Sequence, residues 1–171
     1  MGQPFVLVTV GTDHHPFDRL IGWVDAWLSE RGRERARCFV QCGTSRPPSN
    51  APWTEFLSYD ELQMKVSDAA SVVCHGGPAT IMECRRHGLI PIVVPRKREL
   101  GEHVDDHQGL FTARLSEQGE ISLVSDRDGL WRLLDSVVAD PAAFRGPPVA
   151  LRVEDTVKRF SSLVDGLVIG S

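Results

Sequence analysis

Two kinds of segment alternate along this chain: short apolar runs rich in β-branched residues, and longer stretches in which apolar residues recur every three or four positions. The apolar runs predict strands at residues 5–10, 38–42, 56–57, 71–74, 90–94 and 121–124. The longer stretches predict helices at about 16–28, 60–66, 79–87, 106–117 and 130–138. Because strands and helices alternate strictly, we expect an α/β fold of the Rossmann-like type, with a doubly wound parallel sheet.

The length of 171 residues fits one globular domain, which we expect to span residues 1–145. A C-terminal helical tail is expected at 146–171, where residues 151–163 are amphipathic. The formal net charge of −4 argues against a protein held to nucleic acid by a basic face. Basic residues nevertheless cluster locally, at 31–37 and at 85–98, which leaves a small anionic ligand open.

The four cysteines show neither CxxC spacing nor the density of a disulfide scaffold, so we expect reduced thiols in a cytoplasm. The longest apolar stretch, residues 89–94, is interrupted by Pro91. Residues 1–10 lack the basic start and the cleavage site of a signal peptide. We therefore expect that the chain itself does not cross a membrane.

The loop that follows residues 71–74 is the most informative. It runs His-Gly-Gly-Pro over residues 75–78 and leads into a helix, so free backbone N–H groups and the helix dipole favour an anion there. His75 and Thr80 are able to donate to a phosphate, and Glu83 is able to accept from sugar hydroxyls. A tight turn with a buried histidine explains the loop equally well, and both interpretations stay open. No GxGxxG or P-loop motif supports a dinucleotide oxidoreductase or a P-loop NTPase.

The loop after the first predicted strand offers a second anion position. Gly11 and Thr12 supply backbone and hydroxyl donors beside the first helix, although a turn that requires glycine explains Gly11 as well. His14 and His15 follow, but adjacent side chains seldom converge on one ion and the sequence shows no third ligand nearby. We interpret them as solvated loop histidines and expect no metal.

Two later loops place polar residues before predicted helices. Asp106 is positioned to cap a helix, and His107 and Gln108 extend from its first turn as a set suited to sugar hydroxyls. Capping alone explains Asp106 but not its neighbours. Residues 126–128 spell Asp-x-Asp, which binds Mn²⁺ or Mg²⁺ in other transferases. Because they precede the last helix, acids that complement the helix dipole are the favoured interpretation.

The chain resembles the C-terminal domain of glycosyltransferase family 28. The resemblance covers residues 5–141 and rests on Val-Thr-Val-Gly-Thr at 8–12, on His-Gly-Gly followed by Glu83, and on the string Gly-Glu-His-Val-Asp-Asp-His-Gln at 101–108. The last string is the most specific. More narrowly, the chain is similar to the small donor-binding subunits of split bacterial exopolysaccharide and capsule glycosyltransferases. These are related to the catalytic subunit of the N-glycan UDP-N-acetylglucosamine transferase.

The resemblance implies one half of a GT-B enzyme, the domain that binds the nucleotide sugar. It places residues 57–62 beside the uracil, and it assigns ten residues to the UDP-sugar: Gly11 and Thr12 at the diphosphate; His75, Gly76, Gly77 and Thr80 at the phosphates; Glu83 at the ribose; Asp106 and Gln108 at the transferred sugar, with His107 beside them. No cofactor or metal is expected, because GT-B enzymes stabilise the departing diphosphate with backbone donors and a helix dipole. The other half commonly supplies the catalytic base, and His14 is the weak candidate within this chain.

The activity implied is inverting transfer of a hexose or hexuronate from a UDP-sugar to a lipid-linked glycan, in exopolysaccharide or capsule biosynthesis. The acceptor site would lie on a membrane-associated partner subunit, which would recruit this cytoplasmic chain to the inner face of the membrane. No nucleic-acid partner is expected. The alternative is a non-catalytic subunit that enhances or stabilises a separate transferase. The predicted ligand set favours the enzyme, because an enhancer has no need of sugar-nucleotide ligands.

Overall fold

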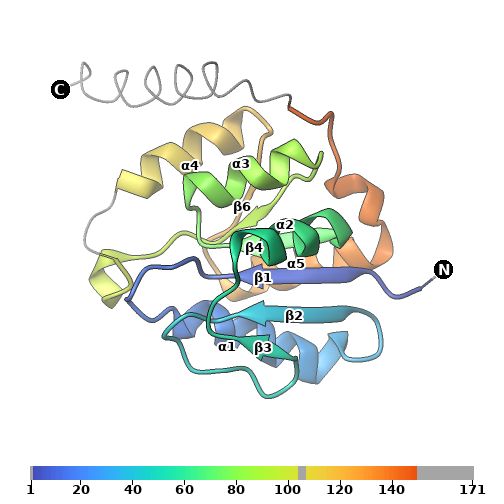
Figure 1. Ribbon diagram of the computed structural model, residues 1–171, viewed down its shortest axis with the longest axis horizontal. Helices are drawn as coiled ribbons and strands as arrows, with labels where there is room; N and C mark the ends of the chain where they lie inside the picture. The colour runs from blue at the N-terminus through green and yellow to red at the C-terminus, as the bar shows by residue number, and fades with distance from the viewer. Residues whose placement is uncertain (1, 104–106, 150–171) are drawn as a thin grey trace.

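One parallel sheet organises the molecule, in the strand order β3-β2-β1-β4-β5-β6 (Figure 1). The computed structural model describes residues 2–103 and 107–149, with the side chains of 107 and 108 left outside the description. The strands are β1 (Phe5–Thr9), β2 (Arg37–Gln41), β3 (Trp53–Thr54), β4 (Ser71–Cys74), β5 (Ile92–Val93) and β6 (Ser122–Leu123). This is the strand order of a doubly wound Rossmann sheet, and the predicted fold class is confirmed.

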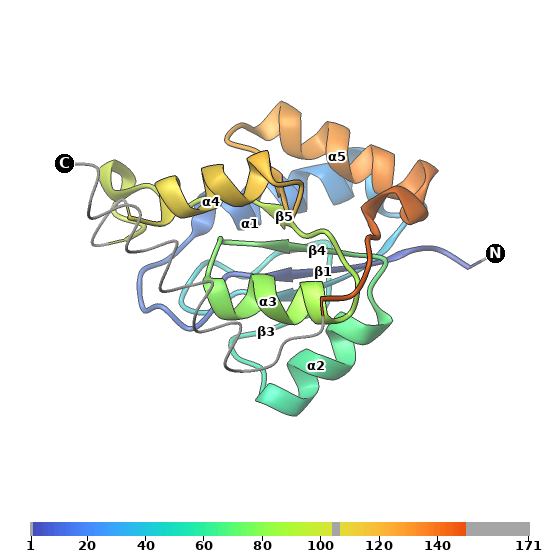
Figure 2. The ribbon, with the colours of Figure 1, turned by 90° about the horizontal axis from the view of Figure 1, so that it is seen from above.

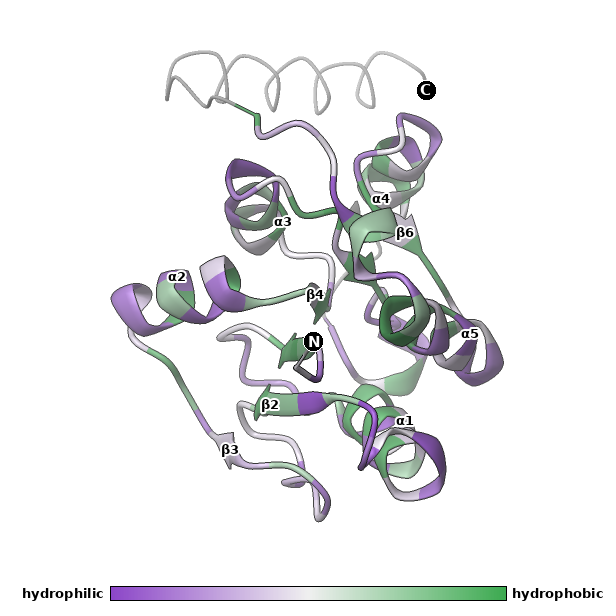
Figure 3. Cartoon of the chain, turned by 90° about the vertical axis from the view of Figure 1, so that its right-hand side faces the viewer, coloured by the Kyte–Doolittle hydropathy of each residue, from purple (hydrophilic) through white to green (hydrophobic). Residues whose placement is uncertain are grey.

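Helices cover both faces of the sheet: α1 (Asp18–Trp27), α2 (Tyr59–Asp68), α3 (Pro78–Arg86), α4 (His107–Glu117) and α5 (Arg127–Ala139). In Figure 3, α1 and α5 lie on one side of the strands and α2 and α3 on the other, and Figure 2 shows the same separation of α5 from α2 and α3. Strand β1 shows why both faces are apolar. Val6 and Val8 pack in the core with α1 and α5, whereas Leu7 between them packs in the core that α2, α3 and α4 cover.

The third strand was predicted at Phe56–Leu57, and that prediction is wrong. Backbone hydrogen bonds set the register instead: the Val40 amide donates to the Pro52 carbonyl and the Cys42 amide to the Thr54 carbonyl, so the pairing strand is Trp53–Thr54. Phe56 is instead exposed. A short edge strand pairs with its neighbour through only two residues. Two residues are too few to form an apolar pattern from which the strand's position could be predicted.

Helix boundaries follow local capping. Ser58 and Glu61 form a capping box at α2, with the Glu61 amide donating to Ser58 Oγ and the Ser58 amide to Glu61 Oε2. The first helix begins at Asp18 and not at Pro16, because the backbone of Phe17 is not helical (φ −122°, ψ 51°); its amide donates to Ser45 Oγ from the loop after β2. A π-helical turn at Leu28–Gly32 extends α1, and 3₁₀ turns occupy Arg98–Leu100 and Pro141–Phe144.

After α5 the backbone returns to the end of α3. The Gly146 amide donates to the Gly88 carbonyl and the Val149 amide to the Arg85 carbonyl. The predicted tail helix at 151–163 lies outside the described residues. Within the described part, no helix combines the length and the apolar character needed to span a bilayer. The four cysteines are buried and free, and burial raises the pKa of the Cys38 and Cys74 thiols to about 12.

Candidate functional site

A cavity of about 490 Å³ opens at the carboxyl ends of β1 and β4. The helix after β1 packs on one face of the sheet and the helix after β4 on the other, so this is the switch point at which doubly wound sheets bind ligands. We call it the switch-point cavity. The volume suits a small molecule. Residues from strands β1 and β2, from four loops and from helices α2 and α3 line it: Thr9, Gly11, Thr12, Asp13, Gln41, Leu57, Leu62, His75, Gly77, Pro78, Ala79, Thr80 and His103.

Another cavity, of about 540 Å³, lies at the opposite end of the sheet, where β1 and β2 begin. Phe5, Arg37 and Phe39 line it, together with residues of the loops before those strands. Arg33 and Arg37 of the basic cluster at 31–37 line it, but none of the residues assigned to the UDP-sugar does. The amino ends of parallel strands are also not where such sheets bind ligands. The switch-point cavity is therefore the candidate site. Seven of the residues assigned to the UDP-sugar line it: Gly11, Thr12, Leu57, Leu62, His75, Gly77 and Thr80.

His75 follows β4 directly, and its ring lies between two glycines. A Cβ built on Gly11 would stand 2.5 Å from ring atom Cε1, and one built on Gly77 would overlap Nε2, so neither position has room for a side chain. Burial, together with the nearby Arg96 guanidinium, lowers the pKa of His75 to about 4, and the ring is neutral at pH 7. Its buried Nδ1 has no hydrogen-bond partner among the described residues. Such an unsatisfied atom costs about 1–3 kcal/mol, a cost that functional sites tolerate.

The turn into α3 leaves its first N–H groups uncapped. Gly76 has φ +93°, a conformation that favours glycine, and a Cβ there would stand 3.0 Å from Thr112. Gly77 is the N-cap, Pro78 follows at the start of the helix, and no side chain caps the first turn. Because Pro78 and Thr80 line the cavity, these amides and the positive end of the helix dipole lie at its wall. The tight-turn and anion-site interpretations therefore describe the same backbone.

Gln41 is a cavity residue that the sequence analysis missed. Its side chain is buried at the end of β2, accepts from the Thr9 hydroxyl, and donates to the Gly11 carbonyl at 2.9 Å and to the Glu55 carbonyl at 2.7 Å. It fixes the loop after β1 against the segment after β3. The available signal was a polar residue inside an apolar run.

Glu83 does not line the cavity. Its carboxylate is buried, accepts from Gln63 Nε2 of α2 at 3.1 Å, makes an ion pair with Arg86 at 3.3 Å, and lies 3.2 Å from His87 Nε2. Glu83 lies one turn after Thr80 on α3, and its role at a ribose stays a prediction. Asp106 and the side chains of 107 and 108 lie outside the described part of the chain, so their roles stay predictions as well.

Arg96 belongs to the basic cluster at 85–98, which left a small anionic ligand open, but its guanidinium is used within the chain. Arg96 is 5% exposed and donates to the carbonyls of Val10, His15 and Glu102 at 2.8 to 2.9 Å. The Glu102 carboxylate in turn accepts from Arg19 through two bonds of 2.8 Å and from the backbone amide of residue 97. The loops after β1 and β5 are therefore held together, and both the carboxylate and the carbonyl of Glu102 take part in these contacts.

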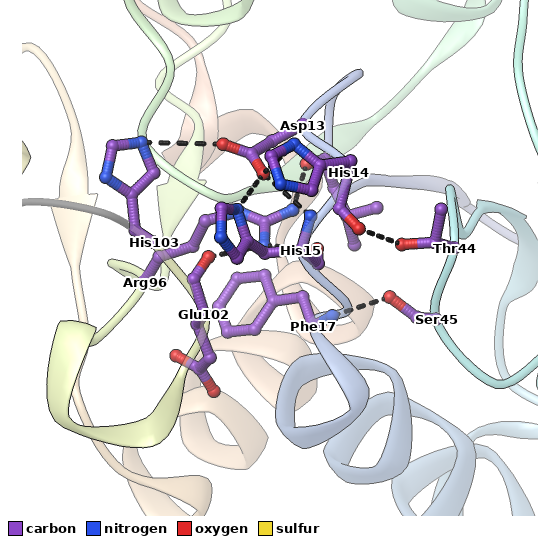
Figure 4. Close-up of polar contacts among 10 residues, drawn as sticks. Asp13, His14, His15, Phe17, Thr44, Ser45, Arg96, Glu102 and His103 are labelled. Carbon is purple, nitrogen blue, oxygen red and sulfur yellow. Dashed lines mark hydrogen bonds and ion pairs between the residues drawn. The ribbon is translucent and has the colours of Figure 1, made fainter.

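A second correction concerns the loop histidines (Figure 4). His14 is 84% exposed, as expected of a solvated residue, but His15 is not solvated: its Nδ1 lies 2.6 Å from Asp13 Oδ1, and its amide also donates to that oxygen. His103 approaches the other carboxylate oxygen of Asp13, with Nε2 at 3.6 Å. The premise that no further ligand lies near these histidines is thus wrong.

The Asp-x-Asp segment behaves as the helix-start interpretation predicts. Asp126 is the N-cap of α5, and its Oδ1 accepts from the Gly129 amide at 2.7 Å. Asp128 is exposed and pairs with Arg127 at 3.3 Å. Neither aspartate lines the switch-point cavity.

Comparison with known proteins gives matches to glycosyltransferases in both sequence and structure. The sequence profile described as "Glycosyltransferase family 28 C-terminal domain" matches residues 5–130. A similar protein is UDP-N-acetylglucosamine--N-acetylmuramyl-(pentapeptide) pyrophosphoryl-undecaprenol N-acetylglucosamine transferase of Alcanivorax borkumensis. It is 34% identical over an alignment of 99 residues, and the match covers 52% of this chain and 26% of that protein.

Solved structures show the same fold. The glycotransferase of kitacinnamycin superimposes with a TM-score of 0.60 at 16% identity over 95% of this chain and 38% of that one. MurG of Acinetobacter baumannii gives a TM-score of 0.57 at 17% identity, over 92% of this chain and 50% of that one. The chain thus spans between about a quarter and a half of the proteins it matches.

Proposed function

Because the chain belongs to the glycosyltransferase family 28 C-terminal domain family, we propose that the switch-point cavity binds the diphosphate of a UDP-sugar. We further propose that the chain is the donor-binding catalytic subunit of a two-subunit, inverting GT-B glycosyltransferase. One observation carries the proposal: the uncapped start of α3 and the glycine-enclosed His75 meet the Gly11 loop in one cavity. That arrangement presents backbone donors to an anion on two sides.

The chemistry of this half of the site is stabilisation of the leaving group. Negative charge grows on the diphosphate as the glycosidic bond breaks, and fixed backbone N–H groups in a partly enclosed cavity stabilise that charge without having to reorganise. The first turn of α3 supplies such groups, and the Thr80 hydroxyl lies beside them. Neutral His75 adds a donor that brings no charge of its own.

The donor and the acceptor are proposed by similarity. The name of the Alcanivorax relative specifies a UDP-N-acetylglucosamine donor and a pyrophosphoryl-undecaprenol acceptor. For this chain we propose transfer of a hexose or hexuronate from UDP to a lipid-linked glycan in exopolysaccharide or capsule synthesis. The likeness of residues 101–108 to split-enzyme subunits supports a separate, membrane-associated partner that carries the acceptor site and holds the chain at the inner face of the membrane.

Thermal stability with and without UDP tests the donor site. A ligand at 100 times its Kd stabilises a folded protein by about 2.7 kcal/mol, which corresponds to a Tm rise of about 5–10 °C at this size. His75→Ala should abolish most of the rise. Arg127→Ala, which changes an exposed residue outside the cavity, should preserve it. A folded wild-type chain whose Tm does not respond to UDP would refute the proposal.

A second measurement separates nucleotide from sugar recognition. If Gln108 contacts the hexose and Glu83 the ribose, Gln108→Ala weakens binding of the UDP-sugar but not of UDP, whereas Glu83→Ala weakens both. Isothermal titration with UDP and with UDP-glucose, UDP-galactose, UDP-glucuronate and UDP-N-acetylglucosamine provides the comparison. Equal losses for UDP and UDP-sugar in Gln108→Ala would contradict the assigned role.

Partner dependence is tested by transfer itself. The described residues form one sheet with one switch point, and the proposed role of its cavity covers the donor half of the reaction, so the acceptor site is assigned to a partner. We expect the purified chain alone to be a poor transferase and to gain activity with its partner. Robust transfer to a lipid-linked acceptor by the single chain, with no copurifying protein, would contradict the two-subunit arrangement.

A further inference from the structure

The backbone N–H of Thr12, in the loop after β1, has no acceptor among the described residues. The polar backbone groups of the preceding residue are both used. The Gly11 amide donates to Thr9 Oγ1 at 3.3 Å, and the Gly11 carbonyl accepts from Gln41 Nε2 at 2.9 Å. Thr12 is exposed and lines the switch-point cavity. Its use by a ligand there depends on the direction in which the N–H points.

The bond from Gln41 sets that direction. In a trans peptide the C=O and the N–H point to opposite sides, and no peptide bond of the described residues is cis. Strand β1 lies between β2 and β4. The Gly11 carbonyl points toward Gln41 at the end of β2, so the N–H of the same peptide points toward the side of β4. There α3 begins, after His75, and the amides of the two loops face one cavity from two sides.

A glutamine side chain meets the requirements of this position, because it combines two N–H donors with one carbonyl acceptor. Its Nε2 donates to the carbonyl oxygens of Gly11 and Glu55, and its Oε1 accepts from the Thr9 hydroxyl. Carbonyl oxygens do not donate, so the amide group cannot be turned over without losing both bonds. Glycine restrains the peptide that follows it very little, so the orientation of that peptide depends on the bond from Gln41.

We propose that Gln41 is a positioning residue, which fixes the Gly11–Thr12 peptide so that its N–H donates to the diphosphate of the nucleotide. The diphosphate contact rests on the proposed function, whereas the fixing of the peptide rests on the contacts within the chain. The segment before residues 57–62, expected beside the uracil, is also held without Gln41, because the Glu55 carbonyl accepts from the Gly43 amide at 2.9 Å. Loss of Gln41 should therefore affect the phosphates and not the base.

The first test compares the free wild type with Gln41→Met, which keeps the length of the side chain and removes its donors and its acceptor. NMR relaxation gives the order parameter of the Thr12 N–H. We expect about 0.85 in the wild type and a fall of at least about 0.15 in Gln41→Met. Gln3→Met removes a glutamine that donates to the Glu34 carbonyl at the other end of the sheet, and should leave the value unchanged. An order parameter that Gln41→Met does not lower overturns the fixing of the peptide.

The second test adds UDP and follows the amide proton signals. In the wild type, the signals of Thr12 and of Ala79, in the uncapped first turn of α3, should both move downfield as they donate to phosphate oxygens. In Gln41→Met the Thr12 shift should be lost and the Ala79 shift retained. The Kd for UDP should rise at least about tenfold, whereas the Kd for uridine, titrated in the same way, should change less than about twofold.

The outcomes separate this inference from the proposed function. A wild-type Thr12 signal that ignores UDP while the Ala79 signal moves overturns the diphosphate contact, and this measurement needs no variant to fold. Equal losses of UDP and uridine affinity in Gln41→Met show a purely structural role and overturn the contact as well. A wild-type chain that binds no UDP refutes the proposed function and the contact with it, while the order parameter still decides whether Gln41 fixes the peptide.

Discussion

The packing of the His75 ring between two glycines allows a sharp test by Gly77→Ala. Gly77 has φ −64° and ψ 131°, which alanine adopts without strain, so the substitution adds only a methyl group against the ring. Overpacking of this kind costs about 1–3 kcal/mol. At about 2–4 °C per kcal/mol for this size, Tm should fall by about 2–12 °C. The matched control is Gly22→Ala in α1, where a Cβ meets nothing within 4 Å and alanine should stabilise the helix by up to about 1 kcal/mol.

The double variant His75→Ala/Gly77→Ala decides whether contact with the His75 ring causes the loss of stability in Gly77→Ala. In a His75→Ala background the added methyl group occupies space that the ring has vacated, and Gly77→Ala should cost less than about 0.5 kcal/mol. Urea denaturation of the wild type, both single variants and the double variant gives the coupling free energy. If Gly77→Ala costs the same with and without the ring, the placement of His75 is refuted. UDP titration of the same four proteins then reports whether that placement matters for the ligand.

Three further outcomes are expected. Arg96→Met leaves three carbonyl oxygens without their donor and should lower the free energy of unfolding by about 3–5 kcal/mol in urea, whereas exposed Arg98→Ser should change it by less than about 0.5. Because His75 stays neutral in the folded state down to about pH 4, the unfolded chain alone takes up its proton between about pH 6.5 and 4. Stability should therefore fall by about 3 kcal/mol over that window, and His75→Gln, followed by urea titrations across pH, should remove this part of the fall. Asp126→Ala should cost about 1 kcal/mol through loss of the cap, and a change in Mn²⁺ or Mg²⁺ dependence of transfer would contradict the capping role.

Local features of the sequence were sufficient for most of the fold. Strand β4 was predicted with its observed bounds, because a central parallel strand buried on both faces has to be apolar throughout. Asp126 was assigned to a helix start because capping involves residues only three positions apart. The prediction of the edge strand β3 failed because two paired residues form no recognisable sequence pattern, and because their position depends on hydrogen bonds to β2.

The candidate site divides in the same way. The turn from β4 into α3 was recognisable, since its glycines and its histidine are adjacent in the chain. The sequence could not show that Glu83 faces α2, that Gln41 lines the cavity, or that the side chain of Arg96 is buried, because each depends on a segment brought in by the fold. Arg96, for example, reaches the Val10 carbonyl across 86 positions of sequence.

The amino-acid sequence by itself determined the alternation of strands and helices and the loops in which the site lies, because hydrophobic periodicity and glycine conformation act over a few residues. Only the tertiary structure decided the protonation and the charge pairing of the residues at the site. It buried His75 beside Arg96 and so made it neutral, and it brought His103, in the loop after β5, next to Asp13, in the loop after β1. Burial and charge pairing depend on distances in space. Residues that are close in space can be far apart in the sequence, so local sequence patterns do not reveal these effects.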